Sequence, residues 1–371
     1  MKHSICRWTF NPGHRGFVPG DIRPDWTDLT TAQFVEIVAT QVKPRVPDSV
    51  ELGIEAHYDN EIDEASAGDV AGALKERGMY LGLITPGAHV HWAYGGVASL
   101  DPKEKADASA FGLRTVDLAY QALKDTWHPD AAPTCVLWNG SWGYDIPGPW
   151  LSDMLANLED EVAGLIEYEQ KEKDGVMYFG IEPKPNEGHP KMLLPTVASA
   201  LLLRRKLADR GLDVSKVGTN KEFGHSEMIG LDAVYDTVEE LREGALVHVH
   251  ANSQGYDGIR QGGPGMFDVD HGAAITGPNI GILRLLLDAG YDRWVGHDMQ
   301  PRPYDNEAQA VDRVVRSVIN VEAMAVVAKE LDVDGMKGLL AARETGKVED
   351  LVGDAISAAR SAAKEMYAGR S

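Results

Sequence analysis

The chain has 371 residues, of which 43% are hydrophobic and 25% are charged, and this composition excludes a disordered chain and a membrane-spanning one. Its 57 acidic residues outnumber 36 basic ones, and the formal net charge of −21 argues against nucleic acid and anionic membranes as partners. The two cysteines, Cys6 and Cys135, are too few for a disulfide framework or a cysteine-rich zinc site. The first residues lack the apolar stretch of a secretory signal, so we expect a reduced, cytoplasmic protein.

Eight short apolar runs recur along the chain, and each is followed by a segment with helical spacing. None of them alternates as a half-exposed strand does, so we expect strands that are buried on both faces. The expected strands are residues 3–9, 51–56, 80–85, 134–139, 177–182, 216–222, 246–251 and 293–298.

This strict alternation predicts an α/β fold, a closed (β/α)₈ barrel, with a doubly wound open sheet as the alternative. In the helix expected after the fourth strand, apolar residues such as Leu158 and Val162 share one face. We expect the acidic residues of its other face to be solvated, namely Glu159, Asp160, Glu167 and Glu169. Residues 1–330 are expected to form the catalytic barrel. Residues 331–371, with a helix over 350–367, are expected to form an extension that packs on another surface, with a neighbouring subunit as one candidate.

Polar side chains close four adjacent strands at the ends where such a barrel has its active site. They are Glu182, Glu222 with His225 just beyond it, His250 and Asp298, and the loop after the seventh strand adds Asp268 and Asp270. Taken singly, each could be a surface acid or a core histidine. Taken together, they exceed what one divalent ion needs, so we expect two ions that share a bridging carboxylate.

Two segments resemble the xylose isomerase family. GIEPKPNEGHPKMLLPT at 180–196 and GTNKEFGHSEMIGLD at 218–232 are similar to its motifs IEPKPNEP…LLPT and N-x-E-x-GH-x-x-M-x-G-L. The similarity continues more loosely, in the same order, over most of residues 50–302. The resemblance implies a (β/α)₈ barrel with two divalent cations per subunit that interconverts an aldose and its ketose, as a homotetramer or dimer.

The resemblance also implies a role for each matching position. One ion would be held by Glu182, Glu222, His250 and Asp298, and the other by Glu222, His225, Asp268 and Asp270. The remaining positions are Lys184 at the substrate carbonyl oxygen, His57 in ring opening, Trp138 as an apolar wall, and Glu187 in support of the second ion.

The sequence departs from the family at positions that touch this site. His250 stands where the family has an aspartate, which favours Mn²⁺ or Co²⁺ over Mg²⁺ and is similar to the rhamnose isomerases. Asn60 stands where an aspartate orients the ring-opening histidine, so either Asp59 takes that role or ring opening is slower or handled elsewhere. Gln300 replaces a lysine.

The loop TPGAHVHWAYGG at 85–96 replaces a segment that carries a phenylalanine in the family. We expect Trp92 to supply the missing aromatic ring and His89 to shape the pocket, with the alternative that both pack a surface loop. Trp142 and Tyr144 either line the mouth of the site or anchor their loop. The long entry loop 11–26 is a candidate lid or subunit contact.

These observations predict an aldose–ketose isomerase that moves a hydride on an open-chain sugar with the help of bound metal ions. Two alternatives stay open. One is a rhamnose-isomerase-like enzyme or an epimerase acting on another sugar, with proton transfer in place of hydride transfer. The other is a sugar- and metal-binding protein without turnover.

Overall fold

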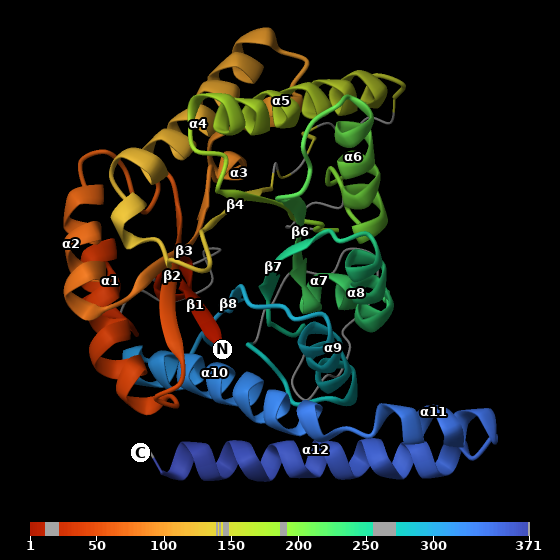
Figure 1. The fold of residues 1–371 in the computed structure, drawn as a ribbon. Helices are drawn as coiled ribbons and strands as arrows, with labels where there is room; N and C mark the ends of the chain where they lie inside the picture. The colour runs from red at the N-terminus through yellow and green to blue at the C-terminus, as the bar shows by residue number, and fades with distance from the viewer. Residues whose placement is uncertain are drawn as a thin grey trace.

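The computed structural model describes residues 1–11, 22–138, 140, 142–143, 148–185, 191–254 and 272–369. Eight parallel strands follow one another in chain order, and β1 pairs with β8 to close the barrel. Helices surround the strands (Figure 1). The (β/α)₈ barrel predicted from the sequence is therefore confirmed, and the open sheet is excluded.

All eight predicted strands are present, within a few residues of their expected ends. They are β1 (Lys2–Cys6), β2 (Glu51–His57), β3 (Tyr80–Thr85), β4 (Thr134–Leu137), β5 (Tyr178–Ile181), β6 (Val217–Glu222), β7 (Leu246–His250) and β8 (Trp294–His297). The first expected strand is too long, because Arg7–Phe10 form a 3₁₀ turn beyond β1. All six residues of β6 are buried, as expected for strands covered on both faces.

Ten α-helices accompany the strands in the described part of the chain. They are α1 (Thr31–Ile37), α2 (Ala67–Arg77), α3 (Ala88–His91), α4 (Pro102–Gln121), α5 (Leu151–Glu172), α6 (Val197–Asp209), α7 (Phe223–Met228), α8 (Ala233–Arg242), α9 (Gly277–Asp288) and α10 (Glu307–Glu330). Thr196, Thr276 and Asn306 cap α6, α9 and α10 by accepting a hydrogen bond from a backbone N–H of the first turn.

The expected apolar face of α5 is confirmed, but its acidic face is not wholly solvated. Leu158, Val162 and Leu165 are buried. Glu169 is buried as well, because the hydroxyl of Tyr120 and the backbone N–H of Met177 donate hydrogen bonds to its carboxylate. A carboxylate with two such donors can be buried at much lower cost than an unpaired one.

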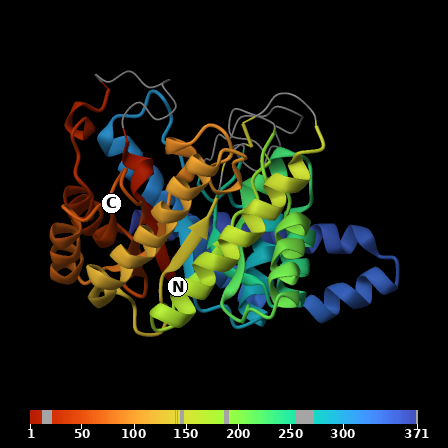
Figure 2. The same cartoon turned by 90° about the horizontal axis from the view of Figure 1, so that it is seen from above.

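The chain continues beyond α10 with α11 (Val333–Ala341) and α12 (Thr345–Ala368), so the predicted C-terminal helix is confirmed and starts five residues earlier than expected. α12 runs along α10 (Figure 1), and its buried residues Ala355, Ala359 and Ala363 repeat every four positions. Figure 2 shows α11 projecting to one side of the barrel. The extension therefore packs on the barrel of its own chain. The division of the chain into a barrel domain, residues 1–330, and a separate extension, residues 331–371, stays a prediction.

Two remaining expectations concern the cysteines and the membrane. Cys6 and Cys135 are both free and buried. Among the described helices, none has the length and apolarity needed to span a bilayer.

Candidate active site

Five of the predicted ligands meet at the carboxyl ends of β5 to β8. Glu182 directly follows β5, Glu222 ends β6, His250 ends β7 and Asp298 directly follows β8. His225 lies in the first turn of α7. Their potential ligand atoms form two groups, each with all atoms within 4.8 Å of one another, namely Glu182, Glu222 and His225, and Glu222, His250 and Asp298. Glu222 belongs to both groups, as a bridging carboxylate would.

Hydrogen bonds from neighbouring amides orient the two glutamates. Asn220 donates from Nδ2 to Oε2 of Glu182 at 3.0 Å, and Asn252 donates from Nδ2 to Oε2 of Glu222 at 2.8 Å. Nδ1 of His250 lies 2.8 Å from Oε1 of Glu222 and 3.9 Å from Oδ2 of Asp298. The carboxylates are thus held in place by the protein itself.

Glu55, in the middle of β2, is a member of the site that the sequence analysis missed. Its carboxylate is completely buried and lies 2.8 Å from Nε2 of His250 and 3.0 Å from Nε2 of His248. Cys6 also donates to it from Sγ, at 3.3 Å. Because Glu55 takes the Nε2 side of His250, the Nδ1 atom of that ring is directed at Glu222 and Asp298. The signal in the sequence was a carboxylate inside an otherwise apolar strand.

The buried carboxylates of the site favour additional positive charge beside them. Burial, followed by the nearby charge of Glu222, raises the pKa of Glu182 to about 7. Burial alone would lower the pKa of His250, but the carboxylates of Glu55 and Glu222 outweigh burial and raise it well above the ordinary value. A divalent cation between these side chains supplies the charge that protons on Glu182 and His250 otherwise supply. Carboxylates combined with imidazoles also suit Mn²⁺ or Co²⁺ as ligands, so the residues present fit a metal ion.

Three residues expected around the second ion lie outside the described residues. They are Asp268, Asp270 and Glu187. The described part of that site consists of Glu222 and His225, with Nε2 of His225 placed 2.8 Å from Oε2 of Glu222. The second ion therefore stays a prediction.

The structure places a different carboxylate beside His57 than the sequence analysis expected. Glu61 accepts a hydrogen bond from Nδ1 of His57 at 3.0 Å, and the backbone N–H of His57 and Nδ2 of Asn11 also donate to its carboxylate. Asp59 and Asn60 are exposed in the turn after β2, and the carboxylate of Asp59 lies 3.8 Å from His91. His57 and Glu61 meet because the turn after β2 brings a carboxylate four positions further along the chain back to the histidine. The orienting carboxylate was expected at position 59 and lies at position 61.

Aromatic rings line one wall of the site. The ring centre of His57 lies 4.4 Å from that of Trp8 and 5.5 Å from that of His89, and His89 lies 4.0 Å from Trp138. Trp8, a second residue that the sequence analysis missed, donates from Nε1 to Oδ1 of Asp298 at 2.7 Å. Nζ of Lys184 lies 4.5 Å from the centre of the Trp138 ring. His89 and Trp138 therefore lie where they were expected, and these five side chains all line the pocket that holds Glu182, His250 and Asp298.

Trp92 does not join this wall. Its ring packs edge-on against Phe111 of α4, with 5.1 Å between ring centres, and neither Trp92 nor Asn60 is among the described residues that line the pocket. The indole of Trp92 therefore packs against α4 and not in the pocket, in agreement with the alternative of loop packing. Trp142 is buried, with Nζ of Lys191 5.0 Å from its ring centre, and Tyr144 lies outside the described residues.

Comparison with known proteins confirms the resemblance that the motifs indicated. No family model matches the chain. It is 30% identical over 213 residues to a xylose isomerase of Streptomyces lividans, an alignment that covers 57% of this chain and 49% of that protein. The chain thus spans about half the length of this curated relative.

Solved structures show that sugar epimerases share the fold. L-ribulose 3-epimerase superposes with a TM-score of 0.58 at 13% identity, covering 88% of this chain and 95% of the other. D-psicose 3-epimerase of Clostridium cellulolyticum H10, solved with D-tagatose, gives 0.57 at 13% identity and covers 88% and 99%. At such identities the likeness concerns the fold, a (β/α)₈ barrel.

Proposed function

We propose that the protein is an aldose–ketose isomerase similar to xylose isomerase, acting on a small sugar by metal-assisted hydride shift. The observation that carries this proposal is the meeting of five side chains at one end of the barrel, beside Lys184 and an aromatic wall. The five are Glu182, Glu222, His225, His250 and Asp298. The sequence similarity to a xylose isomerase supports it independently.

Two divalent cations per subunit, Mn²⁺, Co²⁺ or Mg²⁺, would be held around Glu222. One would be bound by Glu182, Glu222, His250 and Asp298, and the other by Glu222, His225, Asp268 and Asp270. When bound, they supply positive charge to the substrate oxygens during hydride transfer.

The side chains of the pocket have complementary roles in this proposal. The ammonium of Lys184 stabilises negative charge on the substrate carbonyl oxygen. Trp138, which Lys184 faces at 4.5 Å, and Trp8 keep water away from the reacting carbons. His57, oriented by Glu61, exchanges a proton with the sugar as the ring opens.

One observation favours a second candidate, an epimerase or another sugar isomerase that works by proton transfer. Sugar epimerases such as L-ribulose 3-epimerase share this barrel fold. A rhamnose-isomerase-like substrate also fits this candidate, because His250 occupies the position of a family aspartate. A sugar- and metal-binding protein without turnover is the third candidate.

Turnover of a panel of aldoses and ketoses in heavy water tests the proposal. The full chain is loaded with Mn²⁺ or Co²⁺, and products are examined by NMR and mass spectrometry. Isomerisation without deuterium at the reacting carbons supports the hydride shift. Solvent deuterium at those carbons favours the proton-transfer candidate and contradicts the proposed hydride shift. Glu222→Gln serves as the inactive control. Conversion of no sugar, combined with a sugar-dependent rise in melting temperature, favours the binding protein.

We further propose a homo-oligomer, a tetramer or a dimer, in the cytoplasm. The similarity to a xylose isomerase supports this assembly. Light scattering coupled to size-exclusion chromatography measures the mass, and a monomer at micromolar concentration contradicts the proposal.

A further inference from the structure

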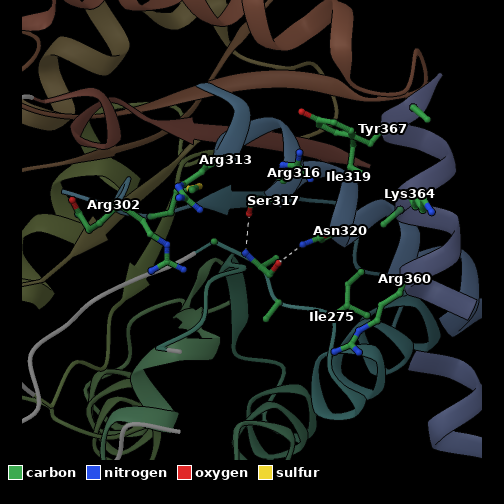
Figure 3. Close-up of a pocket in the computed structure, with 17 residues that line it drawn as sticks. Ile275, Arg302, Arg313, Arg316, Ser317, Ile319, Asn320, Arg360, Lys364 and Tyr367 are labelled. Atoms are coloured by element: carbon green, nitrogen blue, oxygen red, sulfur yellow. Dashed lines mark hydrogen bonds between the residues drawn. The ribbon is translucent and has the colours of Figure 1, made fainter. Parts of the chain in front are cut away.

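A third group of potential metal ligands lies inside the barrel, next to the candidate metal centre. It consists of Cys6, Glu55 and His250, whose ligand atoms all lie within 4.8 Å of one another. All three side chains are buried. By contrast, the cavity of about 770 Å³ between α10 and α12 has no cysteine, histidine or carboxylate among the described residues that line it (Figure 3). The group around Cys6 is therefore the place to look for another ion.

The register of the strands brings these three side chains together. Cys6 is paired with Glu55 in the parallel ladder of β1 and β2, so both side chains point to the same side of the sheet. Sγ of Cys6 lies 3.3 Å from Oε2 of Glu55, and Nε2 of His250 lies 2.8 Å from the same oxygen. β8 lies between β7 and β1 and places Gly296 beside His250, where a Cβ atom would come within 2.9 Å of Nε2. The glycine therefore lets His250 reach Glu55 past β8.

The distances in this group suit a small divalent ion. Zinc binds sulfur at about 2.3 Å and nitrogen or oxygen at about 2.0–2.2 Å, which places tetrahedral ligand atoms roughly 3.3–3.6 Å apart. The sulfur–oxygen distance of 3.3 Å already matches this spacing, and the nitrogen–oxygen distance of 2.8 Å has to open by about half an ångström. Three protein ligands leave the fourth position to water, an arrangement that zinc accepts.

The charge around Cys6 also favours a cation. Burial, followed by the nearby charges of Glu55 and Asp298, raises the pKa of the Cys6 thiol well above its ordinary value, so the thiol is neutral without an ion. The same carboxylates attract a divalent cation, and a thiol that coordinates such a cation is deprotonated. Binding thus forms a bond between sulfur and metal and releases the thiol proton to water.

The sulfur distinguishes this group from the candidate metal centre. The ligands of that centre offer oxygen and nitrogen, whereas a thiolate selects softer ions such as Zn²⁺. His250 belongs to both groups, with Nδ1 directed at Glu222 and Nε2 directed at Glu55. A neutral imidazole has one acceptor nitrogen. An ion on Nε2 therefore leaves the ring proton on Nδ1 and removes His250 from the candidate metal centre.

A short path connects this group to the reaction pocket. His250 lines the pocket, and so do Trp8, Leu83 and Val136. The last three pack with Cys6 in one apolar cluster. These side chains separate Cys6 from the pocket, so an ion has to pass only them to reach the sulfur.

We propose that Cys6, Glu55 and His250 bind a thiophilic divalent cation such as Zn²⁺, and that this ion competes with the candidate metal centre for His250. The binding site does not depend on the proposed function. The competition rests on it, because it requires that His250 holds the catalytic ion through Nδ1. Zn²⁺ bound to Cys6 thus inhibits the proposed isomerase by withdrawing one of its metal ligands.

Ultraviolet titration of the reduced, metal-free full chain with Cd²⁺ tests the site. A bond between cadmium and a thiolate has a charge-transfer band that bonds to oxygen and nitrogen lack. We expect wild type to show the band of one thiolate per chain, Cys6→Ser to lose it and Cys135→Ser to keep it. Cys135 is the matched control, because it is the other cysteine of the chain and is equally buried. Circular dichroism verifies that each variant is folded.

Three results overturn the site. They are the absence of the band in wild type, its persistence in Cys6→Ser, and its loss in folded Cys135→Ser. Because the chain has two cysteines, either variant alone assigns the band, and the test still decides if one of them does not fold.

The competition for His250 is measured by repeating the Cd²⁺ titration with saturating Mn²⁺, whose binding is verified by calorimetry. We expect the Kd for Cd²⁺, read from the thiolate band, to rise by at least about tenfold, because coupling between two sites is reciprocal. An unchanged Kd in a chain that binds Mn²⁺ overturns the sharing of His250. A chain that binds Cd²⁺ through Cys6 but binds no Mn²⁺ contradicts the proposed function, and with it the competition, while the site at Cys6 stands.

Discussion

At the scale of single residues, the carboxylate of Glu55 joins the two histidines of β7. Burial alone would raise its pKa, but His250 and His248 outweigh burial and hold the pKa of Glu55 below its ordinary value. Glu55 is therefore ionised and accepts from both rings. A histidine ligand that donates its second nitrogen to a carboxylate has a fixed orientation and is a stronger base. Glu55 consequently acts on the candidate metal centre through His250.

Glu55→Gln should weaken metal binding without removing a ligand. The amide has nearly the shape of the carboxylate but no charge, so it holds His250 less strongly, and we expect a Kd for Mn²⁺ about 10–100-fold higher. Glu51→Gln is the matched control, because Glu51 lies in the same strand and also pairs with a histidine, His128, away from the site. Calorimetry measures both affinities. Equal Mn²⁺ affinity in wild type and Glu55→Gln would show that His250 is not oriented in this way.

The partner of His57 gives a second prediction at this scale. Because Glu61 bonds to Nδ1 of His57 and is almost fully buried, Glu61→Gln should lower kcat/KM for a ring-form sugar by about tenfold or more. Asp59→Asn should leave it within about twofold, because the side chain of Asp59 is 51% exposed and lies nearer to His91. The measurement is kcat/KM against pH for both variants. A larger loss in Asp59→Asn than in Glu61→Gln would return the orienting role to Asp59.

At the scale of elements, the strands could be predicted because burial on both faces requires short, continuous apolar runs in the sequence. Runs such as 80–85 are apolar on both faces, and the following segments change to helical spacing, so even the order of the barrel was predictable. Partners that are distant in sequence were not predictable. The helical spacing of Glu169 places it on the face of α5 that was expected to be solvated. It is buried because Tyr120 and Met177, which are distant in sequence, donate hydrogen bonds to its carboxylate.

A glycine of β8, Gly296, leaves room for the hydrogen-bonded side chains of Glu55 and His250. A Cβ atom at Gly296 would lie 2.2 Å from Oε1 of Glu55 and 2.5 Å from Cδ2 of His250, so both side chains would have to move. We expect Gly296→Ala to lower the free energy of unfolding by about 1–3 kcal/mol through overpacking, and to weaken Mn²⁺ binding. Chemical denaturation and calorimetry measure the two effects.

Gly353→Ala on α12 is the control for that substitution. Nothing lies within 4 Å of a Cβ atom there, so alanine should raise the free energy of unfolding by about 0.5–1 kcal/mol through its helix propensity. Unchanged stability and metal affinity in Gly296→Ala would mean that β8 can shift away from β2 and β7 without cost.

At the scale of the whole molecule, closure of the barrel assembles the site from both ends of the chain. Trp8 and Asp298 are 290 residues apart and hydrogen-bonded, and Glu55 and His250 are 195 residues apart. The sequence showed which strands end in ligands, because each ligand is adjacent to its own strand. It could not show contacts across the barrel axis, because these depend on which residues of non-adjacent strands point inward. Glu55 was missed for that reason, and Trp8 was missed because it meets Asp298 only when β1 pairs with β8 and closes the barrel.

Metal binding should stabilise the whole chain in a pH-dependent way. Because burial and Glu222 raise the pKa of Glu182 to about 7, its carboxyl group is protonated in acid and must release the proton before it can bind a cation. Above pH 7 the carboxyl group of Glu182 is ionised, and protons no longer compete with the cation for it. Below pH 7 each pH unit should lower the affinity by about tenfold for this one proton.

Since a ligand of the native state raises stability according to its concentration relative to Kd, the rise in melting temperature caused by a fixed concentration of Mn²⁺ should shrink from pH 8 to pH 5. Glu182→Gln cannot titrate at this position. It should therefore show a smaller rise that varies less with pH, because only His250 and the other ligands still compete with protons. Differential scanning calorimetry with and without Mn²⁺ measures the rise in melting temperature for each of the two proteins at pH 5 and at pH 8. If the rise in wild type is the same at pH 5 and pH 8, neither the carboxyl group of Glu182 nor the imidazole of His250 gives up a proton to the ion, which contradicts the proposed metal centre.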